Sequence, residues 1–233
     1  MTKIKFREFP DLDSLSIAAV KYFLKLHSPQ TKQTFLVPGG QTPSAFYRHL
    51  FKSVNDWSNT TLMLSGERLV PEENVMSNVG MVKKLIRENS KKIEFPNLVE
   101  YVTKSIYIDP GEIIDSVNNY VTKIFPLTAA FLGIGVDGHT ASIFPGFENY
   151  PNNSDPLFLV KNLNEPFSRI SISADILINV PQIFFLVSGS NKKSVMKKIR
   201  NMPQQKNTTP VEKIINQSKG EIIFLCDAKS LAF

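Results

Sequence analysis

The chain contains the segment Phe131-Leu-Gly-Ile-Gly-Val-Asp-Gly-His139-Thr-Ala-Ser-Ile-Phe-Pro-Gly146, from which its fold class can be predicted. The segment continues an apolar run, Thr128 to Ile134, that is short enough to be a buried strand. Glycines at positions 133, 135 and 138 then interrupt the run and permit backbone turns that side chains would forbid. The pattern therefore predicts a buried strand that ends in a tight loop.

Polar side chains gather where this predicted strand ends, namely Asp137, His139, Thr140 and Ser142. In open α/β sheets, ligands bind outside the carboxyl ends of the strands. A carboxylate two residues before an imidazole at such a place is typical of a general base and the group that orients it. We therefore predict that His139 and Asp137 are catalytic. On spacing alone, a glycine-rich turn whose histidine merely caps a helix is an equally good interpretation.

Residues 133–138 also match the pattern Gly-x-Gly-x-x-Gly, which is typical of dinucleotide-binding sites when a long helix follows. Here Pro145 and Gly146 leave room for only about two helical turns. The segment also lies past the middle of the chain, and not in its first strand–helix unit. These features argue against a nicotinamide or flavin site.

The chain has 233 residues, enough for one α/β domain, and we expect residues 1–233 to form a single domain. A hydrophobic content of 42% and a charged content of 21% are ordinary for a globular protein. No apolar run reaches the ~20 residues that span a membrane. The N-terminal residues lack the long apolar region of a signal peptide. We expect a cytoplasmic protein without membrane contact.

One cysteine, Cys226, excludes a disulfide within the chain and fits a reducing compartment. Three histidines and one cysteine form no cluster at zinc-ligand spacing, so we expect no metal site. The formal net charge of +6 is compatible with binding of nucleic acid, with binding of a small anionic substrate, or with solvation of the surface alone. The basic residues are mostly scattered pairs without interleaved aromatic residues, so we do not expect nucleic-acid binding.

Strand and helix patterns alternate along the chain, which predicts a mostly parallel sheet with helices on both faces. We predict strands at residues 3–9, 34–37, 60–64, 98–102, 128–134, 157–160, 169–173 and 183–187, with 221–225 closing the sheet. We predict helices from Asp11 or Asp13 to Leu26, from Pro43, and at 78–88, 110–124, 193–202 and 211–217. Asp109 is expected to cap the helix at 110–124.

Four polar loops follow predicted strands at one edge of the sheet, at residues 39–42, 65–68, 137–142 and 189–192. In the first loop, two glycines precede a helix for which Thr42 is a plausible N-cap, and backbone N–H groups at such a place favour an anion. Arg68 carries a guanidinium that can bind a phosphate through two hydrogen bonds. Lys192 lies at the start of a helix, where a cation suggests a bound anion. Each feature has an alternative interpretation. The glycine loop can be only a tight turn, Arg68 can form a surface salt bridge, and Lys192 can lie at a solvated helix end.

Taken together, these segments closely resemble the signature of the 6-phosphogluconolactonases. The resemblance rests on residues 132–146, Gly39-Gly40 with Thr42-Pro43, Glu67-Arg68 with Val70-Pro71 and Ser77-Asn78, Arg169-Ile-Ser, and Gly189 with Lys192. These motifs occur in the family's order across nearly the whole chain. The resemblance implies an α/β fold, a three-layer α/β/α sandwich with a mostly parallel, modified Rossmann-like sheet. It also implies hydrolysis of 6-phospho-D-glucono-1,5-lactone to 6-phosphogluconate, in the oxidative pentose phosphate pathway, without a cofactor.

On this basis we expect His139, oriented by Asp137, to act as general base on a water that attacks the lactone carbonyl. The substrate phosphate would be held by Gly39, Gly40, Thr42, Arg68, Arg169 and Lys192. The expected partner is a small sugar-phosphate lactone, bound by a monomer or a weak homodimer.

Two departures from the resemblance leave alternatives open. Lactonases usually carry an aspartate where this chain has Gly66, and a lysine in the loop before Arg169, which has none here. A sugar-phosphate-binding paralogue without turnover, or with altered specificity, is therefore an alternative, although Glu67 can be expected to replace part of the lost contact. A glucosamine-6-phosphate deaminase is a less well supported alternative. That family has a glutamate where this chain has Phe144, and usually a tyrosine where it has Arg68.

Overall fold

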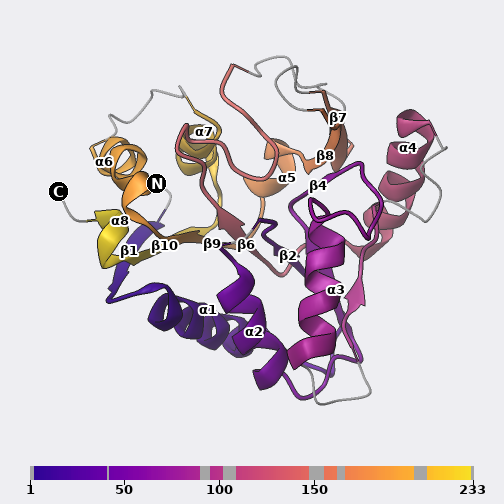
Figure 1. The fold of residues 1–233 in the computed structure, drawn as a ribbon, viewed down its shortest axis with the longest axis horizontal. Coiled ribbons are helices and arrows are strands. Elements are labelled where there is room, and N and C mark those ends of the chain that lie inside the picture. Colours follow the sequence, from indigo (N-terminus) through magenta and orange to yellow (C-terminus); the bar gives the residue numbers. More distant parts are fainter. Residues whose placement is uncertain are drawn as a thin grey trace.

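The computed structural model describes residues 3–40, 42–89, 95–101, 109–146, 155–161, 166–201 and 209–231. Within these residues, seven parallel strands form a sheet in the order β1-β10-β9-β6-β2-β3-β5. Helices α1 and α2 lie below this sheet and α6 and α7 lie above it (Figure 1). The predicted α/β fold, with a mostly parallel sheet between two helical layers, is confirmed.

The strands of the main sheet are β1 (Lys3–Phe9), β2 (Gln33–Val37), β3 (Thr60–Leu64), β5 (Asn97–Leu98), β6 (Ala129–Gly133), β9 (Gln182–Val187) and β10 (Glu221–Asp227). The helices are α1 (Leu12–Leu26), α2 (Ser44–Ser53), α3 (Asn78–Asn89), α4 (Pro110–Val121), α5 (Ala174–Leu177), α6 (Lys193–Arg200), α7 (Pro210–Gln217) and α8 (Ala228–Leu231), with short 3₁₀ helices η1 (Thr122–Ile124) and η2 (Ser190–Lys192). Asp109 caps α4 as predicted, because its carboxylate accepts the N–H of Gly111 at 2.7 Å. No helix in the described part of the chain is long and apolar enough to cross a membrane.

A second sheet was not expected from the sequence. It contains three antiparallel strands, β4 (Gly66–Arg68), β8 (Arg169–Ile172) and β7 (Leu157–Val160), and lies at the upper right of Figure 1. The sequence predicts strands at β7 and β8 but places residues 65–68 in a loop. That prediction is wrong because β4 is only three residues long and has no apolar alternation. Its strand geometry comes from pairing with β8, which the local sequence does not reveal.

Three other predictions need correction. Helix α2 begins at Ser44 after Pro43, so Thr42 does not cap it and Pro43 lies just outside the helix. Strand β10 does not close the sheet but pairs with both β1 and β9. Its residues are almost all buried, whereas β1 is partly exposed along its length and therefore suits the edge. The predicted strand at 98–102 is too long, because β5 contains only Asn97 and Leu98 and residues 99–101 are not in a strand. Residue 102 and most of the proline-rich loop at 149–156 lie outside the described residues.

The chain changes direction across the sheet between β2 and β6. From β2 it proceeds outward through β3 to β5, and from β6 it proceeds the opposite way through β9 to β10. Strands β2 and β6 are nevertheless neighbours, with Phe35 paired to Ala129 and Leu36 to Ala130. Loops that leave such a pair diverge to opposite sides and leave a crevice between them. The loops after β2 and β6 are the ones for which the sequence predicts ligand binding.

Strand β6 is anchored by an aromatic cluster on the side of α1 and α2. Phe131 is fully buried, and its ring stacks on Phe184 at 4.8 Å and on Phe46 at 5.2 Å between centroids. Burying such a side chain stabilises the fold by about 1.5–3 kcal/mol, and each aromatic pair adds roughly 0.5–1.5 kcal/mol. The strand that leads into the predicted catalytic loop is therefore held by stacked aromatic side chains in the core.

We expect Phe131→Ala to lower the free energy of unfolding by about 3–5 kcal/mol, because it removes buried apolar area and leaves a cavity in the aromatic cluster. Denaturant unfolding followed by circular dichroism measures this change. Val75→Ala is the matched control, since Val75 is 96% exposed and its truncation should change stability by less than ~0.5 kcal/mol. A Phe131→Ala protein as stable as the control would show that the cluster does not anchor β6.

Candidate active site

A pocket of about 390 Å³ lies at the crevice between the loops that follow β2 and β6. Strands β4 and β8 of the second sheet and the loop after β9 complete its walls. Seven of the eight residues predicted for the site line it: Gly39, Gly40, Thr42, Arg68, His139, Arg169 and Lys192. The eighth, Asp137, is not part of the lining but contacts His139. The structure thus brings together residues that are far apart in the sequence, with 153 positions separating Gly39 from Lys192.

The imidazole of His139 is held by the carboxylate of Asp137. Nδ1 of His139 lies 2.6 Å from Oδ1 of Asp137, and this oxygen also accepts the backbone N–H of His139 at 3.1 Å. Burial by itself raises the pKa of Asp137, but the hydrogen bonds from His139 and its charge outweigh burial and lower that pKa below the usual value. An ionised carboxylate beside Nδ1 favours the tautomer with its proton there. Nε2 of His139 is then left as the acceptor.

The absence of a side chain at Gly135 permits the contact between His139 and Asp137. A Cβ at position 135 would lie 2.0 Å from Nδ1 of His139 and 2.5 Å from Oδ1 of Asp137, so only glycine fits. The N–H of Gly135 also donates to the carbonyl of His139 at 2.8 Å, which closes the loop on itself. The side chain of His139 remains 32% exposed. The ring is therefore fixed in direction and still accessible to a ligand.

Phe144 forms a wall of the pocket beside the histidine. Its ring centroid lies 4.9 Å from that of His139, and the guanidinium carbon of Arg169 lies 5.5 Å from the same ring. A guanidinium over an aromatic face contributes about 0.5–1 kcal/mol at an exposed site and more where water is excluded. The sequence singled out Phe144 only as a difference from the deaminases. Its contacts with both predicted functional side chains could not be read from the sequence.

Three cationic side chains also line the pocket. Arg68 and Arg169 are directly opposite each other in the pairing of β4 with β8, so their side chains leave the same face of the sheet. Lys192 comes from η2, after β9. Burial lowers the pKa of Lys192, while the negative charge of Asp137 opposes that change. Like charges placed opposite each other on paired strands repel, so this arrangement favours binding of an anion between them.

The glycine loop after β2 differs from the expectation in one respect. The sequence predicts that Gly40 offers its N–H to an anion, but that N–H donates to Oδ1 of Asn78 at 3.0 Å. Gly39, Gly40 and Thr42 line the pocket all the same. Asn78 itself lines the pocket and was not predicted, although it lies in the Ser77-Asn78 motif at the start of α3.

The pocket also contains serines that the sequence analysis missed. Ser65 and Ser188 directly follow β3 and β9, so their position after buried strands was a usable signal. Ser142 was noted as part of the polar group after β6, without a role. Among the described residues, no three His, Cys, Asp or Glu side chains lie close enough to hold a metal ion.

Comparison with known proteins shows which family the chain matches. Residues 11–224 match the model of the family described as glucosamine-6-phosphate isomerases/6-phosphogluconolactonase. The 6-phosphogluconolactonase of Neisseria meningitidis is 30% identical over 165 residues, which cover 68% of this chain and 70% of that protein. The 6-phosphogluconolactonase of Helicobacter pylori is 27% identical over 220 residues, which cover 91% of this chain and 93% of that protein.

A solved structure of 6-phosphogluconolactonase from Trypanosoma brucei has the same fold, with a TM-score of 0.82, 19% identity and coverage of 99% of this chain and 98% of that one. A monomeric glucosamine-6-phosphate deaminase is also similar, with a TM-score of 0.79, 15% identity and coverage of 97% and 98%. The fold is thus shared by both activities and does not by itself separate them. On the match of the family model and of the relatives, the chain belongs to the glucosamine-6-phosphate isomerase/6-phosphogluconolactonase family.

Proposed function

We propose that residues 1–233 act as one catalytic domain that hydrolyses 6-phospho-D-glucono-1,5-lactone to 6-phosphogluconate, in the oxidative pentose phosphate pathway. The observation that carries the proposal is an imidazole oriented by a carboxylate at 2.6 Å, in a pocket that three cationic side chains also line. The relatives named above are 6-phosphogluconolactonases, which supports the same reaction. We further propose a cytoplasmic enzyme, monomeric or weakly dimeric, that needs no cofactor and binds no nucleic acid.

The phosphate serves as the group by which the substrate is positioned. Arg68, Arg169 and Lys192 would bind it through charge-assisted hydrogen bonds. The phosphate is attached through the exocyclic C6 to the ring that contains the lactone carbonyl, so binding the phosphate limits the positions that the carbonyl can take near His139. Such positioning accounts for a substantial part of the barrier reduction in many enzymes. The glycine loop and Thr42 would close around the same end of the substrate.

The hydrolysis then needs one proton acceptor that later becomes a proton donor. Nε2 of His139 takes a proton from water, and the water oxygen forms a bond to the lactone carbonyl carbon. The tetrahedral intermediate collapses when the bond between that carbon and the ring oxygen breaks, and Nε2 returns the proton to the ring oxygen. Asp137 keeps the Nδ1 proton in place and stabilises the imidazolium that forms between the two steps. The acid product loses its own proton to solvent.

A direct test separates this function from sugar-phosphate binding without turnover. Purified protein is assayed for lactone hydrolysis, with the spontaneous reaction subtracted, and binding of 6-phosphogluconate is measured by calorimetry. The proposal requires an enzymatic rate above the spontaneous one. Tight product binding without acceleration would instead establish a non-catalytic paralogue.

We expect His139→Ala to lower kcat by roughly 10²–10⁴-fold, because the variant has no general base. His49→Ala is a matched control. Nε2 of His49 contacts a carboxylate oxygen of Asp13 at 2.7 Å, but His49 does not line the pocket. The control should keep the wild-type rate in the same steady-state assay. A folded His139→Ala protein that loses less than a few-fold would remove this histidine from the mechanism.

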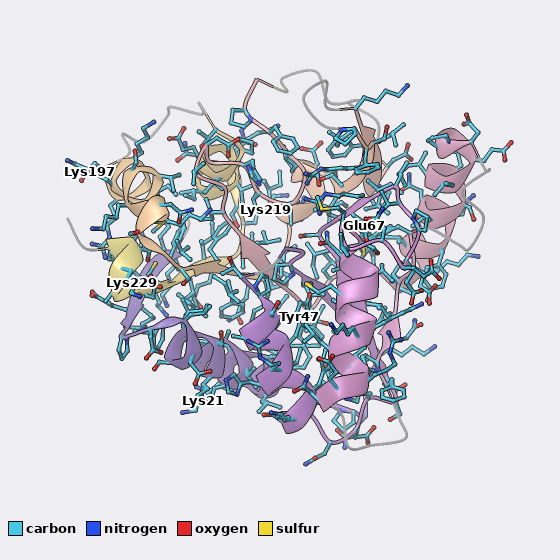
Figure 2. The ribbon with its side chains drawn as sticks, in the orientation of Figure 1. Lys21, Tyr47, Glu67, Lys197, Lys219 and Lys229 are labelled. Carbon is cyan, nitrogen blue, oxygen red and sulfur yellow. The ribbon has the colours of Figure 1, made fainter. Side chains whose placement is uncertain are left out.

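We expect Arg68→Ala and Lys192→Ala to act mainly on binding. Loss of one charge-assisted hydrogen bond costs about 1.5–3 kcal/mol, which corresponds to on the order of 10–150-fold in affinity for 6-phosphogluconate. Inhibition by inorganic phosphate should weaken in parallel. Lys197→Ala is the control, since Lys197 lies on the outer face of α6 (Figure 2). If both pocket variants bind like the control, the phosphate site has been assigned to the wrong residues.

Gly66 is the position where the chain departs from the usual lactonase pattern. Its backbone is not left-handed, so conformation does not require glycine there. A Cβ at Gly66 would, however, lie 2.6 Å from Oγ of Ser142 and 3.2 Å from its backbone nitrogen. Ser142 thus fills the space into which a larger side chain would extend.

We therefore expect Gly66→Asp to lower the free energy of unfolding by about 1–3 kcal/mol through overpacking against Ser142. Combining it with Ser142→Ala removes the closest atom and should recover part of that loss. Denaturant unfolding and lactonase kinetics on the two single variants and the double variant measure the coupling. Strictly additive losses in the double variant would show that the two positions do not compete for space.

A further inference from the structure

Glu67 is a buried carboxylate that the proposed reaction does not use. It belongs to β4, between Gly66 and Arg68, yet it is only 1% exposed and does not line the pocket. The expectation that Glu67 replaces a lost substrate contact is therefore wrong. Figure 2 shows Glu67 above the upper end of α3, the helix that begins at Asn78.

The carboxylate of Glu67 joins β4 to the first turn of α3. Oε1 accepts the backbone N–H of Arg68 at 2.7 Å and that of Asn78 at 2.9 Å. Oε2 accepts the N–H of Val79 at 2.6 Å and the hydroxyl of Ser77 at 3.2 Å. The first N–H groups of a helix have no partners within it, and a negative charge is favourable there. Burial raises the pKa of Glu67, and these hydrogen bonds act against that rise.

The side chain of Asn78 extends this connection to the glycine loop. Its Oδ1 accepts the N–H of Gly40 at 3.0 Å, and its Nδ2 donates to the carbonyl of Gly66 at 2.8 Å. The side chain also packs against Gly39 so closely that a Cβ there would lie 2.2 Å from Nδ2. Asn78 is only 8% exposed. One amide therefore joins the loop after β2 to the strand that carries Arg68.

We propose that Glu67 and Asn78 are positioning residues, which hold Arg68 and the Gly39–Gly40 turn at the separation that a sugar phosphate requires. Glu67 fixes the backbone of Arg68 and places Asn78, and Asn78 in turn fixes Gly40. Strand β4 has only three residues, so the hydrogen bonds of Glu67 and Asn78 add to its pairing with β8 in fixing that geometry. The inference rests on the proposed function, because it assumes that Arg68 and the glycine turn bind the substrate phosphate.

A purely structural role predicts a different outcome, namely lost stability without lost affinity. Asn118 provides the matched control. It is also 8% exposed, its Oδ1 accepts the N–H of Leu157 at 2.9 Å, and its Nδ2 donates to the carbonyl of Leu157 at 3.0 Å. It joins α4 to β7 and does not line the pocket. Asn118→Ala and Asn78→Ala therefore remove the same kind of bridge from different places.

The experiment measures binding separately from catalysis in the protein of residues 1–233. Glu67→Gln, Asn78→Ala and Asn118→Ala are titrated with 6-phosphogluconate and with inorganic phosphate by calorimetry, and the Tm of each is recorded. We expect Glu67→Gln and Asn78→Ala to weaken both ligands by roughly 10–100-fold, as loss of a buried hydrogen bond at a charged group does. Asn118→Ala should lower Tm comparably and leave both affinities within about twofold.

A double variant tests whether Glu67 acts through Arg68. Glu67→Gln combined with Arg68→Ala should lose less affinity than the product of the two single losses, because both act on one contact. Losses that multiply fully would overturn this link.

The remaining outcomes separate the two proposals. Wild-type affinity in folded Glu67→Gln overturns the positioning role while leaving the proposed function intact. If Glu67→Gln fails to fold, Asn78→Ala decides in the same way. A wild-type protein that binds neither 6-phosphogluconate nor phosphate overturns both.

Discussion

The hydrogen bonding of β2 to β6 is the constraint on which the site depends. These strands are not consecutive in the chain, yet they are neighbours in the sheet, and the connections leaving them go to opposite sides. The crevice between them collects the glycine turn from one strand and the loop of Asp137 and His139 from the other. A sheet with a different strand order would contain the same residues and would not bring them to one pocket.

Buried hydroxyl groups hold the loops that surround the crevice. Tyr47 donates to the carbonyl of Pro38 at 2.6 Å, Tyr101 donates to that of Leu64, and Thr140 donates to that of Gly133 at 2.8 Å. Each acceptor lies at or just beyond the end of a strand, where the ladder no longer supplies a partner. An unpaired carbonyl in such a place would cost roughly 1–3 kcal/mol. The loops are polar and rich in glycine, but these hydroxyl groups fix their backbones at the strand ends.

The parts of the structure that the sequence predicts are those with local causes. Neighbouring residues determine the apolar run of β6, the cap at Asp109 and the glycine turns around His139, so these features could be recognised from the sequence. Strand β4 could not, since its geometry comes from pairing with β8 across 100 residues of chain. The same holds for Asn78, whose two side-chain partners belong to the loop after β2 and to β4. Thr42 was assigned as a cap from its neighbours, although the helix begins two residues later.

The cross-strand pair of Arg68 and Arg169 also links ligand binding to folding. Two arginines are directly opposite each other in the register of a small sheet, and an anion bound by both would offset the repulsion between their positive charges. A ligand that binds only the folded state raises stability by about 2.7 kcal/mol at a concentration of 100 times its Kd. The second sheet should therefore resist local opening most when anions saturate the pocket. If sugar phosphates bind here as proposed, their binding and the opening of the second sheet are linked equilibria, and proteolytic cleavage within β4 and β8 would slow as the ligand concentration rises above its Kd.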